Sequence, residues 1–277
     1  MGKKNEVLDI LKWMGIAVLG AGLGASLGAG GMYLVMDGIE NHYASMSHGI
    51  PLLKDGIHMK KGDHKFVITD NFYNLLSYDT PEEDQKMVID GLKEAYTTLG
   101  NYNSQLNFKL CTTVDECANK YNIPKVDKIG QQDIPLYMTE EVLDGNKYVM
   151  AHTDWKYNLF SFEMEKLSIT FKKNYALSVW NQYDTIEKTL APKNTSVYTT
   201  AVHESMHAMG FAHIDDQESI MNTYVKYNSP KDLTEYDIEI LDKYNVQFYG
   251  AESTLKTSED LLKTTATYTK AEEELGM

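Results

Sequence analysis

The 277-residue sequence contains no arginine, so lysine supplies all 26 basic residues, and 40 acidic residues give a formal net charge of −14. No lysine cluster follows the pattern that a nucleic-acid groove requires, so we expect no nucleic-acid partner. Disorder along the whole chain is also excluded. Apolar residues make up 43% of the chain and aromatic residues 11%, which is enough to bury a substantial core.

Cysteine is scarce. Only Cys111 and Cys117 are present, and neither belongs to a C-x-x-C or Cys/His pattern, so the sequence offers no cysteine-based metal site. In an oxidising compartment the two residues could close a small disulfide loop. Two separate, unreactive thiols are the alternative.

Long uncharged runs are absent except near the N-terminus, where residues 13–36 carry no charge. Roughly 20 residues suffice to span a bilayer. Lys3, Lys4 and Lys12 precede this run, an excess that places residues 1–12 in the cytoplasm and the remainder outside. We therefore predict a transmembrane helix that anchors a single-pass protein in the cell membrane. A cleaved secretory signal is the alternative, and the protein would then be secreted.

The uncharged run is rich in glycine. Gly20, Gly24 and Gly28 stand at small-xxx-small spacing, which would permit weak self-association of two such helices within the membrane. The simpler alternative is that these glycines only lower the hydrophobicity of the segment.

The rest of the chain divides into three parts. Residues 37–63 mix Gly, His, Lys and Asp without sustained periodicity, which is typical of a stalk or linker. Residues 64–248 carry the periodic patterns of a folded domain. Residues 249–277 are rich in Thr, Glu and Lys with one apolar pair, so we expect a weakly structured tail.

Within the domain, short apolar runs and alternating apolar residues predict strands, and apolar residues at helical spacing predict helices. We expect strands at 66–68, 106–110, 134–138, 148–153 and 167–171. Helices are expected after Thr80-Pro81, ending at Gly100, around residues 203–207, and from Thr234, where Asp237 forms a capping-box-like pair. This order of elements predicts an α+β fold.

The densest cluster of chemically active residues is HESMHAMGFAH, residues 203–213. His203 and His207 stand four residues apart, so a helix places both imidazoles on one face, where they can share a metal ion. Glu204 is offset by about 100° around the helix. It is therefore a poor ligand, but it can contact a water molecule on that metal and act as general base.

Gly210 and His213 extend the pattern. Glycine readily adopts the left-handed conformation that ends a helix and turns the chain back, which makes His213 available as a third ligand. Three neutral imidazoles around one catalytic Zn²⁺ leave a coordination position open for water, as catalytic sites require. The sequence gives no support for a structural Ca²⁺ or a second Zn²⁺.

The motif H-E-x-x-H-x-x-G-x-x-H, followed by a methionine turn at residues 219–221, resembles the signature of metzincin zinc peptidases. The short interval to the turn and the helix start at 233–238 are most similar to matrixins. The resemblance implies a metzincin-like catalytic domain with a twisted mixed β-sheet, an active-site helix and a C-terminal helix. It also implies a zinc-dependent endopeptidase that hydrolyses extracellular proteins or peptides.

The resemblance also assigns roles to single residues. Met221 would lie beneath the zinc, Asp237 would brace the domain beneath the active site, and residues 148–153 would form the cleft rim that pairs with substrate. Tyr224 is one position too far along the chain for the tyrosine that joins the zinc shell in some metzincins. His152 resembles a ligand of a second matrixin zinc, but its His-Gly-Asp partner segment is missing.

Two features depart from the matrixin pattern. Ile214 follows the third histidine where matrixins usually carry serine, and the cysteine latch of the family propeptide has no counterpart. A zinc-stabilised binding or adhesion module without turnover therefore stands as the alternative to an enzyme.

Asp215 and Asp216 are candidates for orienting a ligand imidazole, or else belong to a solvated loop.

Overall fold

The computed structural model describes residues 33–35, 45–47, 49–103, 105–143, 145, 148–178, 195–215, 217–223, 230 and 232–251. Its strands are β1 (Tyr33–Val35), β2 (Ser45–Ser47), β3 (Ile50–Leu52), β4 (Gly62–Ile68), β5 (Leu106–Thr112), β6 (Ile134–Thr139), β7 (Ala151–Asn158) and β8 (Met164–Lys172). Its helices are α2 (Asp70–Ser77), α3 (Glu82–Asn101), α4 (Asp115–Tyr121), α5 (Lys173–Ala176), α6 (Ser196–Met209) and α7 (Glu235–Tyr249). This mixture confirms the predicted α+β class.

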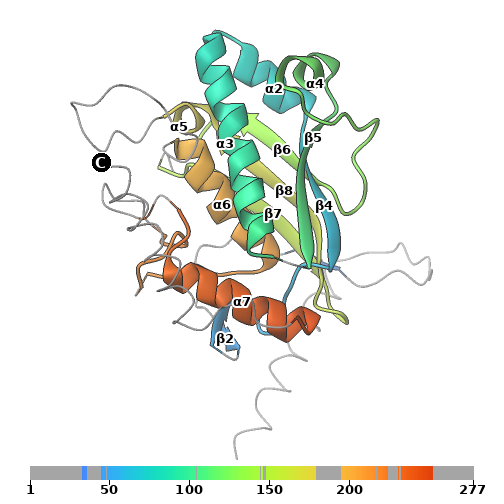
Figure 1. Ribbon diagram of the computed structural model, residues 1–277, viewed down its shortest axis with the longest axis vertical. Coiled ribbons are helices and arrows are strands. Elements are labelled where there is room, and N and C mark those ends of the chain that lie inside the picture. The colour runs from blue at the N-terminus through green and yellow to red at the C-terminus, as the bar shows by residue number, and fades with distance from the viewer. Residues whose placement is uncertain are drawn as a thin grey trace, which may run out of the picture. The chain divides into compact units, whose positions relative to one another are not determined.

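One mixed sheet organises the domain, with strand order β1-β7-β8-β6-β4-β5. Strands β8, β6, β4 and β5 run parallel, whereas β7 is antiparallel to β8. Helices α3 and α6 lie side by side against the sheet, where α3 contacts β5 and α6 contacts β7 and β8 (Figure 1). The active-site helix therefore packs near the β7 edge of the sheet.

The predicted membrane segment lies outside the described residues except for Tyr33–Val35. These three residues form a strand that pairs with Lys156–Asn158 of β7, and this backbone pairing is incompatible with the helix that we expected to extend to Met36. No helix in the described part of the chain is both long and apolar enough to cross a membrane. The predicted tail lies outside the described residues from 252 onward.

The segment before β4 differs from the stalk that we expected at 37–63. Ile50, Leu52, Ile57 and Met59 are fully buried in the core. The segment turns at Gly49 and Gly56, which both have positive φ, and these turns interrupt any regular apolar period. The described part of this segment thus belongs to the folded domain.

Two features expected of helix α3 differ in the structure, and the short helices were not predicted. Thr80 does not cap α3; Pro81 occupies the N-cap position, and the helix continues through Gly100 to Asn101. The short helices α2 and α4 had no clear period in the sequence. The capping box at α7 is confirmed, because the Thr234 side chain accepts from the Asp237 amide while the Asp237 carboxylate accepts from the Thr234 amide.

Both cysteines are buried, free thiols. Burial raises the pKa of the Cys117 thiol to about 11 and also raises the pKa of Cys111. The structure therefore favours the alternative of two separate, unreactive thiols over a disulfide loop.

Tyr244 in α7 ties the N-terminal segment to the active-site helix. Its hydroxyl donates to the Met209 carbonyl at the end of α6 and accepts from the Met59 amide, both at 2.7 Å. Burial raises the pKa of this hydroxyl, so it stays protonated and can make both bonds. One hydroxyl thus joins three parts of the chain that are far apart in sequence.

We predict that Tyr244→Phe lowers the free energy of unfolding by about 1–3 kcal/mol, because two buried backbone groups lose their partner. Urea denaturation followed by circular dichroism measures the change. Tyr78→Phe is the matched control. The Tyr78 side chain is largely exposed, so this variant should stay within about 0.5 kcal/mol of wild type. Equal stabilities for the two variants would contradict the bridging role of Tyr244.

Candidate active site

Helix α6 carries the first two histidines and the glutamate. The Thr195 side chain caps its N-terminus by accepting from the Tyr198 amide at 3.2 Å. The spacing of four residues places His203 and His207 on the same face, as predicted. Glu204 and His207 are buried and His203 is half-buried.

Gly210 ends this helix in the left-handed region, with φ of +107°. Its amide donates to the His207 carbonyl at 2.9 Å. A Cβ atom at this position would lie 2.9 Å from the side chain of Ile57 and 3.1 Å from its carbonyl oxygen. Both the dihedral angle and the close approach therefore require glycine, which confirms the predicted turn.

After Gly210 the chain returns along the segment that precedes β4. The Leu53 amide donates to the Gly210 carbonyl at 2.8 Å, and the Ala212 amide donates to the Pro51 carbonyl at 3.1 Å. This short pairing directs the chain so that His213 reaches the two helical histidines.

The three imidazoles converge through their Nε2 atoms. The Nε2 of His207 lies 3.0 Å from that of His203 and 3.1 Å from that of His213. Tetrahedral Zn²⁺ with Zn–N distances of about 2.0–2.1 Å would separate its ligand nitrogens by roughly 3.3 Å. Within the described residues, these histidines form the sole cluster of three or more potential metal ligands.

Backbone carbonyls determine which nitrogen of each helical imidazole carries a proton. His203 Nδ1 lies 2.8 Å from the Ile220 carbonyl oxygen, and His207 Nδ1 lies 2.8 Å from that of Phe211. Because a carbonyl only accepts, Nδ1 must be the donor in both rings. In the neutral rings the Nε2 lone pairs then face each other, which is repulsive without a cation between them. The donor set therefore fits Zn²⁺.

The methionine turn is held by a buried carboxylate. Asp237 accepts from the Ser219 hydroxyl at 2.5 Å and from the Ile220 amide at 2.9 Å, while it also caps α7. The Met221 carbonyl accepts from the Ile214 amide at 2.9 Å. Asp237 thus combines the capping and bracing roles, and it positions the Ile220 carbonyl that orients His203.

Glu204 contacts strand β7. The Thr153 hydroxyl lies 2.5 Å from the Glu204 carboxylate atom Oε2 and 3.0 Å from the Glu204 backbone oxygen. Both side chains are buried. No local sequence pattern indicates the contact between Thr153 and Glu204, because it depends on how α6 packs against the sheet.

The structure also locates the secondary candidates. His152 pairs with Asp154, with 3.4 Å between Nε2 and Oδ1, and this hydrogen bond lowers the pKa of the Asp154 carboxyl. Asp215 accepts from the Thr223 amide and hydroxyl at 2.8 and 2.9 Å, so it holds the loop instead of an imidazole. Asp216 and Tyr224 lie outside the described residues.

Ile214 and the rim strand also have defined positions. Ile214 is buried in the core, so the departure from the family pattern at this position serves packing. The rim strand was predicted at 148–153. In the structure this strand is β7, which begins three residues later, at Ala151, and extends to Asn158.

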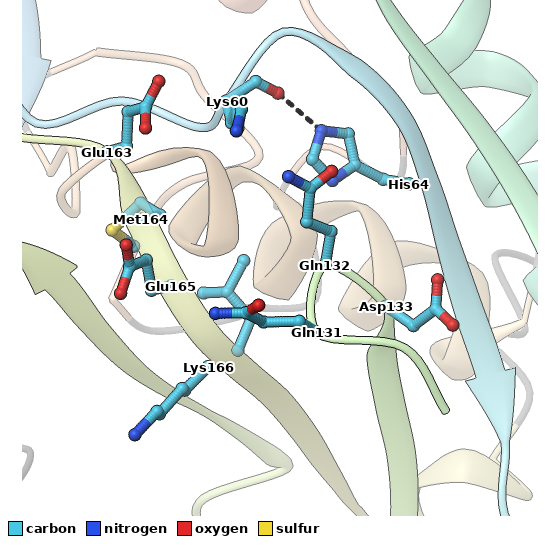
Figure 2. Close-up of a pocket in the computed structure, with 10 residues that line it drawn as sticks. Lys60, His64, Gln131, Gln132, Asp133, Glu163, Met164, Glu165 and Lys166 are labelled. Carbon is cyan, nitrogen blue, oxygen red and sulfur yellow. Dashed lines mark hydrogen bonds between the residues drawn. The ribbon is translucent and has the colours of Figure 1, made fainter. Parts of the chain in front are cut away.

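A pocket that does not include His203, His207 or His213 lies near the start of β8. It has a volume of about 120 Å³ and is lined by Lys60, His64, Gln131, Gln132, Asp133 and residues 163–167 (Figure 2). Burial lowers the pKa of His64, whose Nε2 lies 2.6 Å from the Lys60 carbonyl oxygen. This pocket adjoins the start of β8, whereas Thr153 pairs with Ile169 further along that strand.

Comparison with known proteins agrees with this geometry. Residues 70–246 match the sequence model of the family described as Matrixin. The matched range includes all three histidines, Glu204 and the methionine turn. The fold and the histidine cluster define a metzincin-type metallopeptidase domain, and the chain belongs to the matrixin family.

Two individual proteins are also similar. Matrix metalloproteinase-A of Caenorhabditis elegans is 35% identical over 66 residues, which are 24% of this chain and 12% of that protein. Proteasome component ecm29 of Schizosaccharomyces pombe is 26% identical over 212 residues, which are 73% of this chain and 12% of that protein. The chain thus spans 12% of the length of each relative, and the family assignment depends on residues 70–246.

We predict that Gly210→Ala lowers the free energy of unfolding by about 2 kcal/mol or more, because alanine is strained at this φ and its Cβ would displace Ile57. Zinc affinity should fall as well, since the turn directs His213. Thermal unfolding and competition with a chelator dye measure the two effects.

Gly100→Ala serves as the control for this variant. Gly100 lies in α3 with open space around its Cβ position, so alanine should leave stability unchanged or raise it by up to about 1 kcal/mol. If Gly210→Ala were as stable as Gly100→Ala and bound zinc as tightly, the turn at Gly210 would not require glycine.

Proposed function

We propose that this protein is a zinc-dependent endopeptidase that hydrolyses extracellular proteins or peptides. The observation that carries the proposal is the convergence of three imidazole Nε2 atoms next to a buried glutamate in a domain of the matrixin family. His203, His207 and His213 would hold the zinc. Only three protein ligands converge among the described residues, which would leave a coordination position for water or substrate.

Zinc, when bound, supplies a Lewis acid that activates a water molecule and polarises a peptide carbonyl. Glu204 is the general base of the proposed reaction. Its carboxylate accepts the proton that the attacking water loses, and it then donates this proton to the departing amine. The same side chain thus acts first as base and then as acid. The Ile220 and Phe211 carbonyls keep the helical imidazoles oriented throughout.

An extended substrate would bind along β7. One edge of this strand pairs with β8, and β1 pairs with the other edge only at Lys156–Asn158. Within the described part of the chain, no strand covers the outer edge of residues 151–155. A peptide can add to such an edge by backbone hydrogen bonds, and Thr153 places this edge next to Glu204.

The proposed location is the cell surface, with the peptidase domain outside the membrane. Support comes from the sequence alone, through the lysines before the uncharged run at 13–36. Secretion after cleavage of this run remains the alternative. Protease protection of the full chain in intact cells distinguishes an external domain from an internal one.

We predict that Glu204→Gln lowers kcat/KM by about 10²–10⁴-fold, because general acid–base catalysis is lost while the side chain keeps its size. Zinc content should stay at one per chain. A peptide library with mass-spectrometric detection of cut sites identifies the substrate for this assay. The adhesion alternative makes the opposite prediction, since zinc-loaded wild type would cut no peptide and binding would survive the substitution.

Removal of zinc with a chelator should abolish peptide cleavage, and added Zn²⁺ should restore it. Activity should also fall steeply in acid, because protons compete with zinc for the imidazole lone pairs. Zinc content measured by atomic emission at each pH tests this cause directly. Activity that persisted at pH 4, or that was indifferent to zinc removal, would contradict the proposed metal chemistry.

A further inference from the structure

Thr153 is the one described side chain that forms a hydrogen bond with the carboxylate of Glu204. Its hydroxyl has a single proton and two acceptors within reach, Oε2 at 2.5 Å and the backbone oxygen of Glu204 at 3.0 Å. Hydrogen bonds to a carboxylate are shorter and stronger than those to a neutral carbonyl. The proton is therefore directed mainly at Oε2.

The position of Thr153 is itself well defined. Thr153 pairs with Ile169 in the centre of the β7–β8 ladder, and only 7% of the residue is exposed. A β-branched side chain also has few accessible rotamers. The hydroxyl is thus presented to Glu204 from the rigid sheet, and the hydrogen bond constrains the carboxylate.

We infer that Thr153 is a positioning residue for Glu204. By donating to Oε2, the threonine hydroxyl fixes the carboxylate orientation and leaves Oε1 to take the proton from water. No other described group donates to Oε1, in agreement with this division between the two oxygens. The inference rests on the proposed peptidase function, and it adds a specific second component to the acid–base machinery.

The geometry also suggests a competing, purely structural role. The same hydroxyl could simply attach α6 to the sheet through the backbone oxygen of Glu204. In that case its removal would lower stability and leave turnover unchanged. The two roles therefore make different predictions for kcat and for the position of the Glu204 carboxylate.

The test compares Thr153→Val, which keeps the shape but lacks the hydroxyl, with Thr153→Ser, which keeps the hydroxyl. In the zinc-loaded full chain, Thr153→Val should lower kcat about 10-fold or more with KM within about 2-fold, since catalysis is sensitive to small misplacements. Thr153→Ser should recover kcat to within about 3-fold of wild type. Both variants should contain one zinc per chain.

The control is Thr112→Val in β5, at the opposite edge of the sheet. Thr112 is also buried, and its hydroxyl donates to the Ile68 carbonyl at 3.1 Å. This variant removes a comparable hydroxyl far from the histidines. It should lose some stability but keep the wild-type kcat.

Crystal structures of the zinc-loaded wild type and Thr153→Val proteins give a readout that does not need turnover. The Glu204 carboxylate should keep one position in wild type and should shift or split into several positions in the variant. An unmoved carboxylate, or a wild-type kcat for Thr153→Val, would overturn the inference. A carboxylate that moves in Thr153→Val, together with a wild-type protein that cleaves no peptide, would refute the proposed function and still support the positioning role.

Discussion

The backbone carbonyls of Ile220 and Phe211 impose the constraint on which the site depends. Each accepts from the Nδ1 of one helical imidazole at 2.8 Å, so the proton is held there and the Nε2 lone pair faces inward. With the opposite tautomer, N–H groups would point at each other across the cluster and no cation could bind. The spacing of the histidines is thus necessary for metal binding, but the two carbonyls are also needed, because they orient the Nε2 lone pairs toward the metal position.

These two carbonyls are positioned by distant parts of the chain. The Phe211 carbonyl follows the turn at Gly210, which packs directly against Ile57 and pairs with the segment before β4. The Ile220 carbonyl belongs to a turn that the buried Asp237 carboxylate holds from the start of α7. Tyr244 of α7 links the segment before β4 and α7 itself to the end of α6, through its hydrogen bonds with Met59 and Met209. Stability of the domain and orientation of the imidazoles therefore depend on the same contacts.

Much of this arrangement could be predicted from the sequence, for identifiable reasons. Strands β6 and β8 alternate buried and more exposed residues, and helices α3 and α7 each bury one face, so their apolar periods were readable. The short apolar run of β4, the histidine spacing and Gly210 are local signals. The segment at 50–59 was wrongly predicted to be a linker. Its buried residues are separated by turns, so they show no regular apolar period in the sequence. Thr153 could not be found, since its contact depends on the packing of α6 against β7.

The surroundings of Glu204 also bear on the choice between an enzyme and a binding module. Only 6% of Glu204 is exposed, and burial of a carboxyl group with one hydrogen-bond donor costs free energy. A purely structural zinc site would gain more from a fourth protein ligand that closed the coordination shell. A buried acid that directly follows the first of three converging imidazoles along α6 suits proton transfer, and metal-dependent folding does not require it. The burial of this one side chain therefore favours the peptidase.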